Sequence, residues 1–216
     1  MVQIPVTTSK KKDLIVGLID RSGSMQRIKE DTEGGLLSFI EEQKQDSGDK
    51  DVLMALYEFD DEYNEVYPVT PIADVPDYAL QPRGLTALVD AIGLTINAVE
   101  EAVKKEKPDT VTVLILTDGN ENASKEYTLD DVKKRVQQCR DKEWNFIFLG
   151  ANIDAVSVAQ GYGFDSRTAM TYGANTEGVK STFAAASGVT RSMRAGMVDG
   201  GFTDKDRETA MGGESS

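Results

Sequence analysis

The chain has 216 residues, of which 39% are hydrophobic and 28% charged, so it is long enough and apolar enough to form one domain with a substantial core. Asp and Glu number 37 against 24 Lys and Arg, and the resulting net charge of −13 makes nucleic acid and anionic membranes poor partners. The chain has no histidine and a single cysteine, which excludes Ser-His-Asp and Cys-His catalysis, the usual zinc sites and an internal disulfide.

The beginning of the chain carries no sign of export. Residues 1–12 contain three lysines but no apolar stretch followed by a small-residue cleavage site, so they do not read as a secretory signal. No apolar run in the chain approaches the roughly 18 residues that a membrane span needs. We therefore expect a cytoplasmic protein.

The first part of the chain predicts strands and a helix in alternation. Asp13–Asp20 is short and almost continuously apolar, which is typical of a strand buried on both faces of a parallel sheet. A helix is predicted over Met25–Gln45, because mostly apolar residues recur there at steps of three and four. A second strand, Asp51–Phe59, is joined by a polar turn to a third, Tyr63–Val69, which Pro68 places at a sheet edge.

The alternation continues to the end of the chain. The further predicted elements are a helix over Thr86–Lys105, a strand over Val111–Thr117, a helix that begins near Thr128, a strand over Trp144–Leu149, a short helix over Asp154–Gln160, a strand over Ala169–Tyr172 and a helix over Thr176–Met197. In the helix after Thr128, the spacing predicts that Leu129, Val132, Val136 and Cys139 face inward. Strands that alternate with helices predict a three-layer α/β/α fold with a doubly wound, mostly parallel sheet.

Three polar loops are predicted to meet at one edge of this sheet, since ligands of open parallel sheets bind beyond the carboxyl ends of the strands. They are Asp20–Ser24, Gly84–Leu88 and Thr117–Gly119. Carboxylates and hydroxyls together suit Mg²⁺, Mn²⁺ or Ca²⁺ better than zinc or copper. The candidate metal ligands are Asp20, Ser22, Ser24, Thr86 and Asp118.

Simpler roles are open to the same residues. Asp20, Ser22, Ser24 and Thr86 could cap helices, and Asp118 with its following glycine could form only a turn. We interpret Asp60–Glu62 as a solvated hairpin tip and Glu121 with Asn122 as an exposed loop that could reach the site. Arg21 either screens or selects the partner of a metal, or is simply exposed to solvent.

At the candidate ligands the sequence resembles the von Willebrand factor type A (vWA) family. The metal-ion-dependent adhesion site (MIDAS) of that family has the pattern D-x-S-x-S, then a threonine, then an aspartate, and all of these positions are filled. The stretches GLTALVDAIG and LTDGNEN are similar to those of compact stand-alone members from bacteria and phages. The resemblance implies a six-stranded sheet of order 3-2-1-4-5-6 with an antiparallel edge strand, in a vWA domain over residues 13–197 that follows an extension, 1–12. The end of the chain, 198–216, is rich in Gly, Ser and charged residues and is predicted to be a flexible tail.

The resemblance also implies a function. Asp20, Ser22, Ser24, Thr86 and Asp118 would hold the metal directly or through water and leave a position for an Asp or Glu of a partner protein. Similar acidic subunits occur beside AAA+ ATPases, so an AAA+ ATPase or another complex subunit is an expected partner. We expect no enzymatic activity, no nucleic acid and no membrane.

Two other classes of function remain open. The first is a structural or charge-mimicking protein that acts through its acidic surface, with a metal that only stabilises the fold. The second is a Mg²⁺-dependent phosphohydrolase of the haloacid dehalogenase type, which needs a second aspartate two residues after the first. Ser22 stands at that position, and no lysine-bearing motif for phosphate is evident.

Overall fold

The computed structural model describes residues 10–197 and 200–212, and its centre is a six-stranded sheet of order β3-β2-β1-β4-β5-β6. The strands are β1 (Lys12–Asp20), β2 (Asp51–Phe59), β3 (Tyr63–Pro71), β4 (Thr110–Thr117), β5 (Asn145–Ala151) and β6 (Ala169–Tyr172). β3 is antiparallel to β2 and lies at an edge, and all other neighbours are parallel. The predicted fold class and strand order are confirmed.

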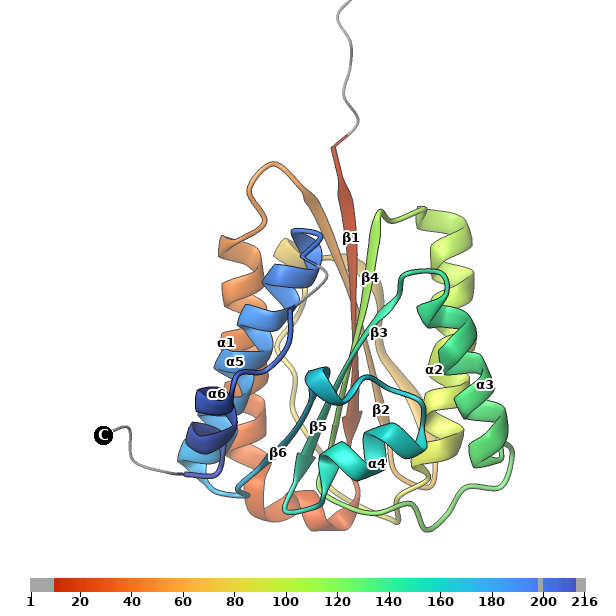
Figure 1. Ribbon diagram of the computed structural model, residues 1–216, viewed down its shortest axis with the longest axis vertical. Coiled ribbons are helices and arrows are strands. Elements are labelled where there is room, and N and C mark those ends of the chain that lie inside the picture. Colours follow the sequence, from red (N-terminus) through yellow and green to blue (C-terminus); the bar gives the residue numbers. More distant parts are fainter. Residues whose placement is uncertain (1–9, 198–199, 213–216) are drawn as a thin grey trace, which may run out of the picture.

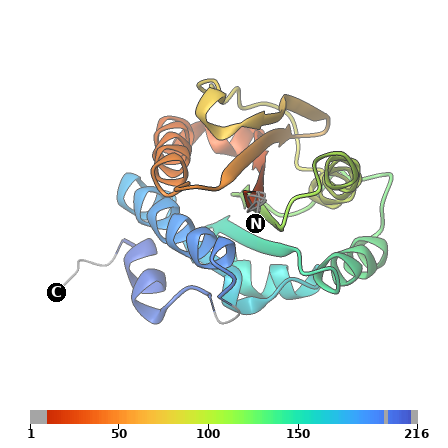
Figure 2. The same cartoon turned by 90° about the horizontal axis from the view of Figure 1, so that it is seen from above.

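Helices cover both faces of this sheet (Figures 1 and 2). They are α1 (Lys29–Gln45), α2 (Leu88–Glu106), α3 (Leu129–Arg140), α4 (Ala155–Gly161), α5 (Thr176–Arg194) and α6 (Asp204–Ala210). One layer holds α1, α5 and α6, and the other holds α2, α3 and α4. Short 3₁₀ turns complete the connections, the first of which, η1 (Gly23–Ile28), joins β1 to α1.

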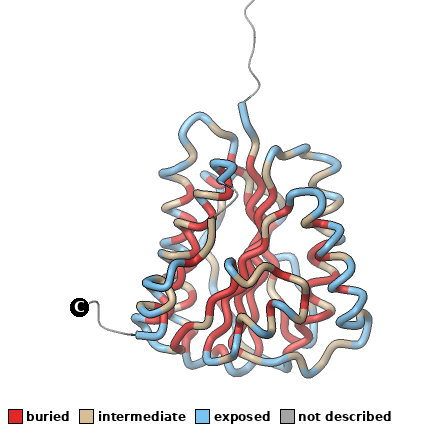
Figure 3. Tube along the Cα trace, in the orientation of Figure 1, coloured by how far each residue is buried: buried red, intermediate tan, exposed pale blue. Residues whose placement is uncertain are grey.

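The central strands are apolar because both of their faces are buried (Figure 3). In β1, Ile15 and Ile19 belong to the core beneath α1 and α5, whereas Leu14, Val16 and Leu18 belong to the core beneath α2 and α3. All five side chains are almost fully buried, and each contributes about 1.5–3 kcal/mol by leaving water. This alternation holds β1 between the two helical layers. It therefore fixes the position of Asp20, the last residue of the strand, at the edge of the sheet.

Helices α1 and α5 pack closely because a glycine lies at their crossing. A Cβ atom at Gly35 would stand 2.2 Å from Cδ2 of Phe183, which is itself buried in α5. The neighbouring Gly34 has nothing within 4 Å of the same position. The absence of a side chain at Gly35 therefore allows the ring of Phe183 to lie against the α1 backbone.

Several details of the predicted helices are wrong. α1 begins at Lys29 rather than Met25, because residues 23–28 form the 3₁₀ turn η1, and α2 begins at Leu88 rather than Thr86. Leu129 is 46% exposed, because it is the first residue of α3 and points away from the sheet, whereas Val132, Val136 and Cys139 are buried as predicted. The last long helix ends at Arg194 rather than Met197, and Gly196 follows with a left-handed backbone (φ 76°) that ends helices readily.

The C-terminal segment is not the loose tail that we predicted. Thr203 and Asp206 form a capping box at the start of α6. The backbone amide of Gly173, just after β6, donates to the carbonyl of Ala210, and both Phe202 and Ala210 are buried. The remaining residues of the predicted tail, 198–199 and 213–216, and residues 1–9 of the predicted extension lie outside the described residues. None of the helices in the described ranges is long and apolar enough to cross a membrane.

Candidate metal centre

The candidate ligands lie at the carboxyl end of the two central strands, at the lower edge of the sheet in Figure 1. Asp20 is the last residue of β1, and Asp118 directly follows β4. These strands are parallel neighbours, with Ile19 opposite Leu116, so their ends reach the same level. The strand order reverses between them, which is where α/β sheets bind ligands.

Asp20 is fully buried and held from two sides. Its Oδ1 accepts a hydrogen bond from the Ser22 amide at 2.6 Å, and its Oδ2 accepts one from the Thr117 hydroxyl at 2.6 Å. Burial raises the pKa of this carboxyl to about 6 although both hydrogen bonds act in the opposite direction. Each oxygen keeps a lone pair for a cation or a cation-bound water.

Ser22, Ser24 and Asp118 form a chain of oxygen atoms beside Asp20. The hydroxyl oxygens of Ser22 and Ser24 are 3.1 Å apart, and the Ser24 hydroxyl donates to Oδ1 of Asp118 at 2.5 Å. Adjacent ligands of a Mg²⁺ octahedron, each about 2.0–2.1 Å from the ion, are about 2.9 Å apart. The two separations among these three oxygens lie on either side of that value.

Thr86 completes the set from the loop before α2. Its amide donates to Oδ1 of Asn122 at 2.9 Å, and its carbonyl accepts from the Asn122 amide at 3.0 Å. A Cβ atom at Gly119 would lie 3.3 Å from the Thr86 hydroxyl oxygen and 3.9 Å from that of Ser24, so these two hydroxyls flank Gly119. Within the described ranges the Thr86 hydroxyl has no hydrogen-bond partner, which leaves it available to a cation.

The capping alternative for Thr86 fails because other groups cap α2. Oε2 of Glu121 accepts from the Val89 amide at 2.8 Å, and the Ser124 hydroxyl oxygen accepts from the Asp90 amide at 3.0 Å. Glu121 and Asn122 are therefore not merely an exposed loop. They attach the loop after β4 to the start of α2 and so bring Thr86 to Asp118.

Two exposed side chains of different character flank the candidate ligands. Nη2 of Arg27 lies 3.5 Å from Oδ2 of Asp118, and its side chain is 53% exposed. Leu85, next to Thr86, is one of the few large apolar side chains on the surface, at 57% exposed.

Arg21 and Asp60 differ from the sequence interpretation. Arg21 is only 6% exposed, and its Nη1 donates to Oε1 of Glu58 at 2.8 Å. Asp60 is fully buried and lies 3.0 Å from Nε of Arg21. Neither residue is solvated, and the two side chains pair with each other rather than with the candidate ligands.

The donor set fits a divalent cation bound through hydroxyls as well as carboxylates. In the part of the chain that the structure describes, no group of three or more His, Cys, Asp or Glu side chains could hold a metal. A cation at this edge would depend on two carboxylates and three neutral hydroxyls. Such a set suits Mg²⁺, Mn²⁺ or Ca²⁺.

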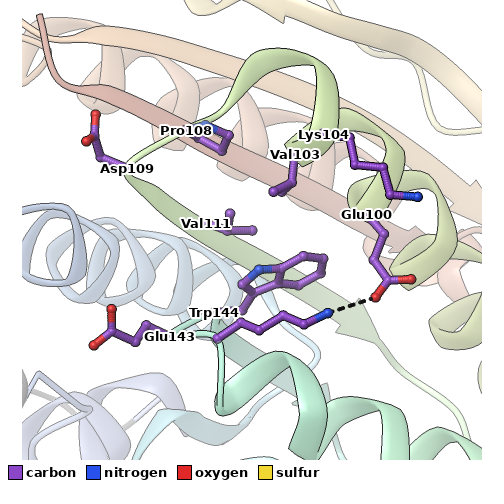
Figure 4. Close-up of a pocket in the computed structure, with 9 residues that line it drawn as sticks. Glu100, Val103, Lys104, Pro108, Asp109, Val111, Glu143 and Trp144 are labelled. Carbon is purple, nitrogen blue, oxygen red and sulfur yellow. Dashed lines mark hydrogen bonds and ion pairs between the residues drawn. The ribbon is translucent and has the colours of Figure 1, made fainter. Parts of the chain in front are cut away.

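A separate hollow of about 370 Å³ lies at the opposite end of the sheet (Figure 4). It lies between the end of α2 and the starts of β4 and β5, with Trp144 at its centre and a 3.3 Å ion pair between Lys142 and Glu100 at its rim. None of the candidate metal ligands lines it. The hollow is therefore not part of the candidate metal centre.

Comparison with known proteins finds similarity in structure only. No protein-family model and no curated protein matches the chain. Among solved structures, the vWF domain of the pili tip protein Mfa5 from Porphyromonas gingivalis is similar over 90% of this chain and 99% of that one, with a TM-score of 0.64 and 11% identity. The SpRpn10 VWA domain is similar over 82% of this chain and 94% of that one, with a TM-score of 0.55 and 10% identity.

A mussel byssus protein, proximal thread matrix protein 1, adds information on a metal. Its structure with a zinc-occupied MIDAS motif is similar over 84% of this chain, with a TM-score of 0.63 and 14% identity. The chain spans 46% of the length of that protein. Taken together, these structures show that the fold is that of vWA-type domains.

Proposed function

We propose that the protein is a non-enzymatic interaction module that binds a divalent cation through Asp20, Ser22, Ser24, Thr86 and Asp118 and, through it, an acidic side chain of a partner protein. The observation that carries the proposal is the convergence of three separate loops on one edge of the sheet. Hydrogen bonds connect Asp20, Ser22, Ser24 and Asp118, and the free Thr86 hydroxyl lies beside them.

The charges of the site favour an external anion. Asp20 and Asp118 together neutralise a divalent cation, and the three hydroxyls add no further negative charge. The cation therefore keeps its attraction for an outside carboxylate. An acidic protein can in this way bind an acidic partner at one point while its remaining surface repels it.

The identity of the cation follows from ligand chemistry. Oxygen ligands favour Mg²⁺, Mn²⁺ or Ca²⁺, and Mg²⁺ is our first expectation. Zinc should be tested together with these three cations, because the structure of the mussel protein has a zinc-occupied MIDAS.

Arg27 and Leu85 would add selectivity for the partner. The guanidinium of Arg27 is half exposed beside Asp118, so it can donate to the same acidic side chain that reaches the ion or to a neighbouring one. Leu85, which precedes Thr86 in the chain, offers an exposed apolar contact. The expected partner, such as an AAA+ ATPase or another complex subunit, therefore presents an Asp or Glu close to an apolar side chain.

The net charge of −13 favours one alternative, in which the acidic surface itself binds the partner and the cation only stabilises the fold. Ionic strength distinguishes the two. Binding by bulk charge weakens steadily as salt rises, whereas binding through a coordinated carboxylate depends mainly on the cation.

Two experiments test the proposal. The first is calorimetric titration of the protein with each cation, and the second is capture of partners from the native cell with and without chelator. Asp118→Ala should abolish cation binding and chelator-sensitive capture while leaving the fold intact. Glu101→Ala is the matched control, because Glu101 is 74% exposed on α2 and forms an ion pair with Lys104 at the surface. If the same partners bound equally to wild type in excess chelator and to Asp118→Ala, the acidic-surface alternative would replace this proposal.

A further inference from the structure

A charge cluster surrounds the buried Asp60 and consists of Arg21, Glu58, Asp60, Glu62 and Arg83; Arg21 is buried too, whereas the Arg83 and Glu62 side chains are half or more exposed. Asp60 is at its centre: Oδ2 accepts from Nε of Arg83 at 2.6 Å and lies 3.0 Å from Nε of Arg21. Oδ1 of Asp60 accepts from the amide of Glu62 at 2.6 Å. Asp60 is fully buried, so both arginines meet at a carboxylate without access to water.

The cluster connects the two loops that carry the serines and Thr86. The Arg83 amide donates to the carbonyl of Arg21 at 2.7 Å, and the Ala87 amide donates to the carbonyl of Asp60 at 2.8 Å. The Gly23 amide donates to the carbonyl of Gly84 at 3.3 Å, between the candidate ligands Ser22 and Ser24. The segment before and after Thr86 is thus attached to the loops that follow β1 and β2.

The backbone conformation of this segment is tightly constrained at Gly84. Its backbone is left-handed (φ 69°), and a Cβ atom there would stand 2.0 Å from Oδ1 of Asp61. The same oxygen accepts from the Leu85 amide at 3.3 Å. Backbone amides from Arg83 to Ala87, except that of the glycine, all donate to fixed acceptors.

We propose that Asp60, with Arg21 and Arg83, forms a positioning unit of the metal centre that sets the spacing between the serine hydroxyls and Thr86 and thereby makes the site selective for a small cation. This inference rests on the proposed metal-binding function. Arg21 lies within the D-x-S-x-S segment, but its guanidinium pairs with Glu58 and Asp60 rather than with a candidate ligand. It acts on the cation only through the loop that it holds.

The cost of burying charges favours a role beyond holding a hairpin. A buried ion pair gives little net stability, because removing its charges from water offsets their attraction, and an apolar cluster would hold the hairpin equally well. Charged groups with fixed hydrogen bonds do provide a rigid spacing. Mg²⁺ needs that rigidity, since it demands near-octahedral ligands at about 2.0–2.1 Å, whereas Ca²⁺ accepts longer and irregular coordination at about 2.3–2.6 Å.

Asp60→Asn tests this role because it keeps the size of the side chain and its contact with the Glu62 amide but removes the charge. We expect its affinity for Mg²⁺ to fall about 10-fold or more, as for other residues that orient metal ligands. The affinity for Ca²⁺ should fall by less than about 3-fold, so the preference for Mg²⁺ decreases. Titration calorimetry with each cation alone, well below the melting temperature, gives both constants.

Two further variants keep the test decisive. Glu101→Gln is the matched control, since the Glu101 side chain is 74% exposed on α2 and lies outside this cluster, and it should change neither constant by more than about 2-fold. Arg83→Gln removes a half-exposed partner of Asp60 and should reproduce the loss of Mg²⁺ preference if Asp60→Asn does not fold. Unchanged constants, or equal losses for both cations, would overturn the positioning role alone. Failure of the wild-type protein to bind any cation would overturn the proposed function together with this inference.

Discussion

Asp20 must be ionised to bind a cation, yet its surroundings favour the neutral acid. Burial raises the pKa of this carboxyl to about 6. We therefore expect the affinity for Mg²⁺ or Mn²⁺ to fall about tenfold for each pH unit below 6, because the ion competes with a proton. Calorimetric titration between pH 5 and pH 7.5 measures this, and a constant affinity over that range would contradict it.

The same carboxyl makes the metal-free protein less stable as pH rises. Since the pKa of Asp20 is higher in the folded than in the unfolded chain, the folded state holds the proton more tightly between pH 3.8 and about 6. Its contribution to stability, at most about 3 kcal/mol, is complete below that window and lost above it. Thermal unfolding in chelator should show this pH dependence in wild type but not in Asp20→Asn, whose neutral amide cannot titrate.

The candidate ligands could be predicted from the sequence, whereas the roles of the residues that support them could not. The ligand pattern was readable because Asp20, Ser22 and Ser24 are neighbours in sequence and Thr86 and Asp118 stand at predicted strand and helix ends. The roles of Asp60 and Glu121 were not readable, because each depends on a partner that only the tertiary fold brings near: Asp60 meets Arg21 through the pairing of β1 with β2. Without knowledge of that pairing, an acidic residue in a polar turn such as 60–62 is predicted to be exposed to solvent.

At the scale of elements, adjacent glycines in α1 should respond to alanine in opposite directions. Gly35→Ala places a methyl group 2.2 Å from the ring of Phe183 and should cost about 1–3 kcal/mol. Gly34→Ala meets nothing within 4 Å and should stabilise the helix by about 0.5–1 kcal/mol. Denaturant unfolding of both variants checks this. Equal effects would mean that α1 and α5 do not cross at Gly35.

The face of α3 that contacts the sheet can be checked through its cysteine. Cys139 is 1% exposed, and burial raises the pKa of its thiol to about 11. Labelling by an aqueous thiol reagent should therefore be slow in the native protein and rapid after unfolding in guanidinium. Rapid labelling without unfolding would place the thiol on the outer face of the helix.

Strands and long helices followed from sequence because burial leaves a strong pattern. A strand covered on both faces is apolar throughout, and a helix covered on one face repeats apolar residues at steps of three and four. The short α6 has neither pattern: it is mostly charged and buries only Ala210. Its capping box, Thr203 with Asp206, was the one available signal, and the surrounding Gly and Ser residues concealed it.

For the whole molecule, a cation at the proposed centre should stabilise the fold. It would hold together the ends of β1 and β4 and remove the repulsion between Asp20 and Asp118. At ten times its dissociation constant, an ion adds about 1.4 kcal/mol, or about 3–6 °C in melting temperature for a domain of this size. Differential scanning calorimetry with each divalent cation against a chelator control tests this. No shift with any cation up to tens of millimolar would contradict the site.

The direction of β1 decides how the protein should be held in binding experiments. This strand enters the sheet at Lys12, at the edge opposite the candidate metal centre, and ends at Asp20. The nine residues of the strand, at a rise of about 3.3 Å from each to the next, separate its two ends by about 26 Å. A tag attached ahead of Lys10 would therefore anchor the molecule to a sensor surface with Ser22, Ser24 and Asp118 facing the solution. Anchoring through lysines of random position would not guarantee that orientation.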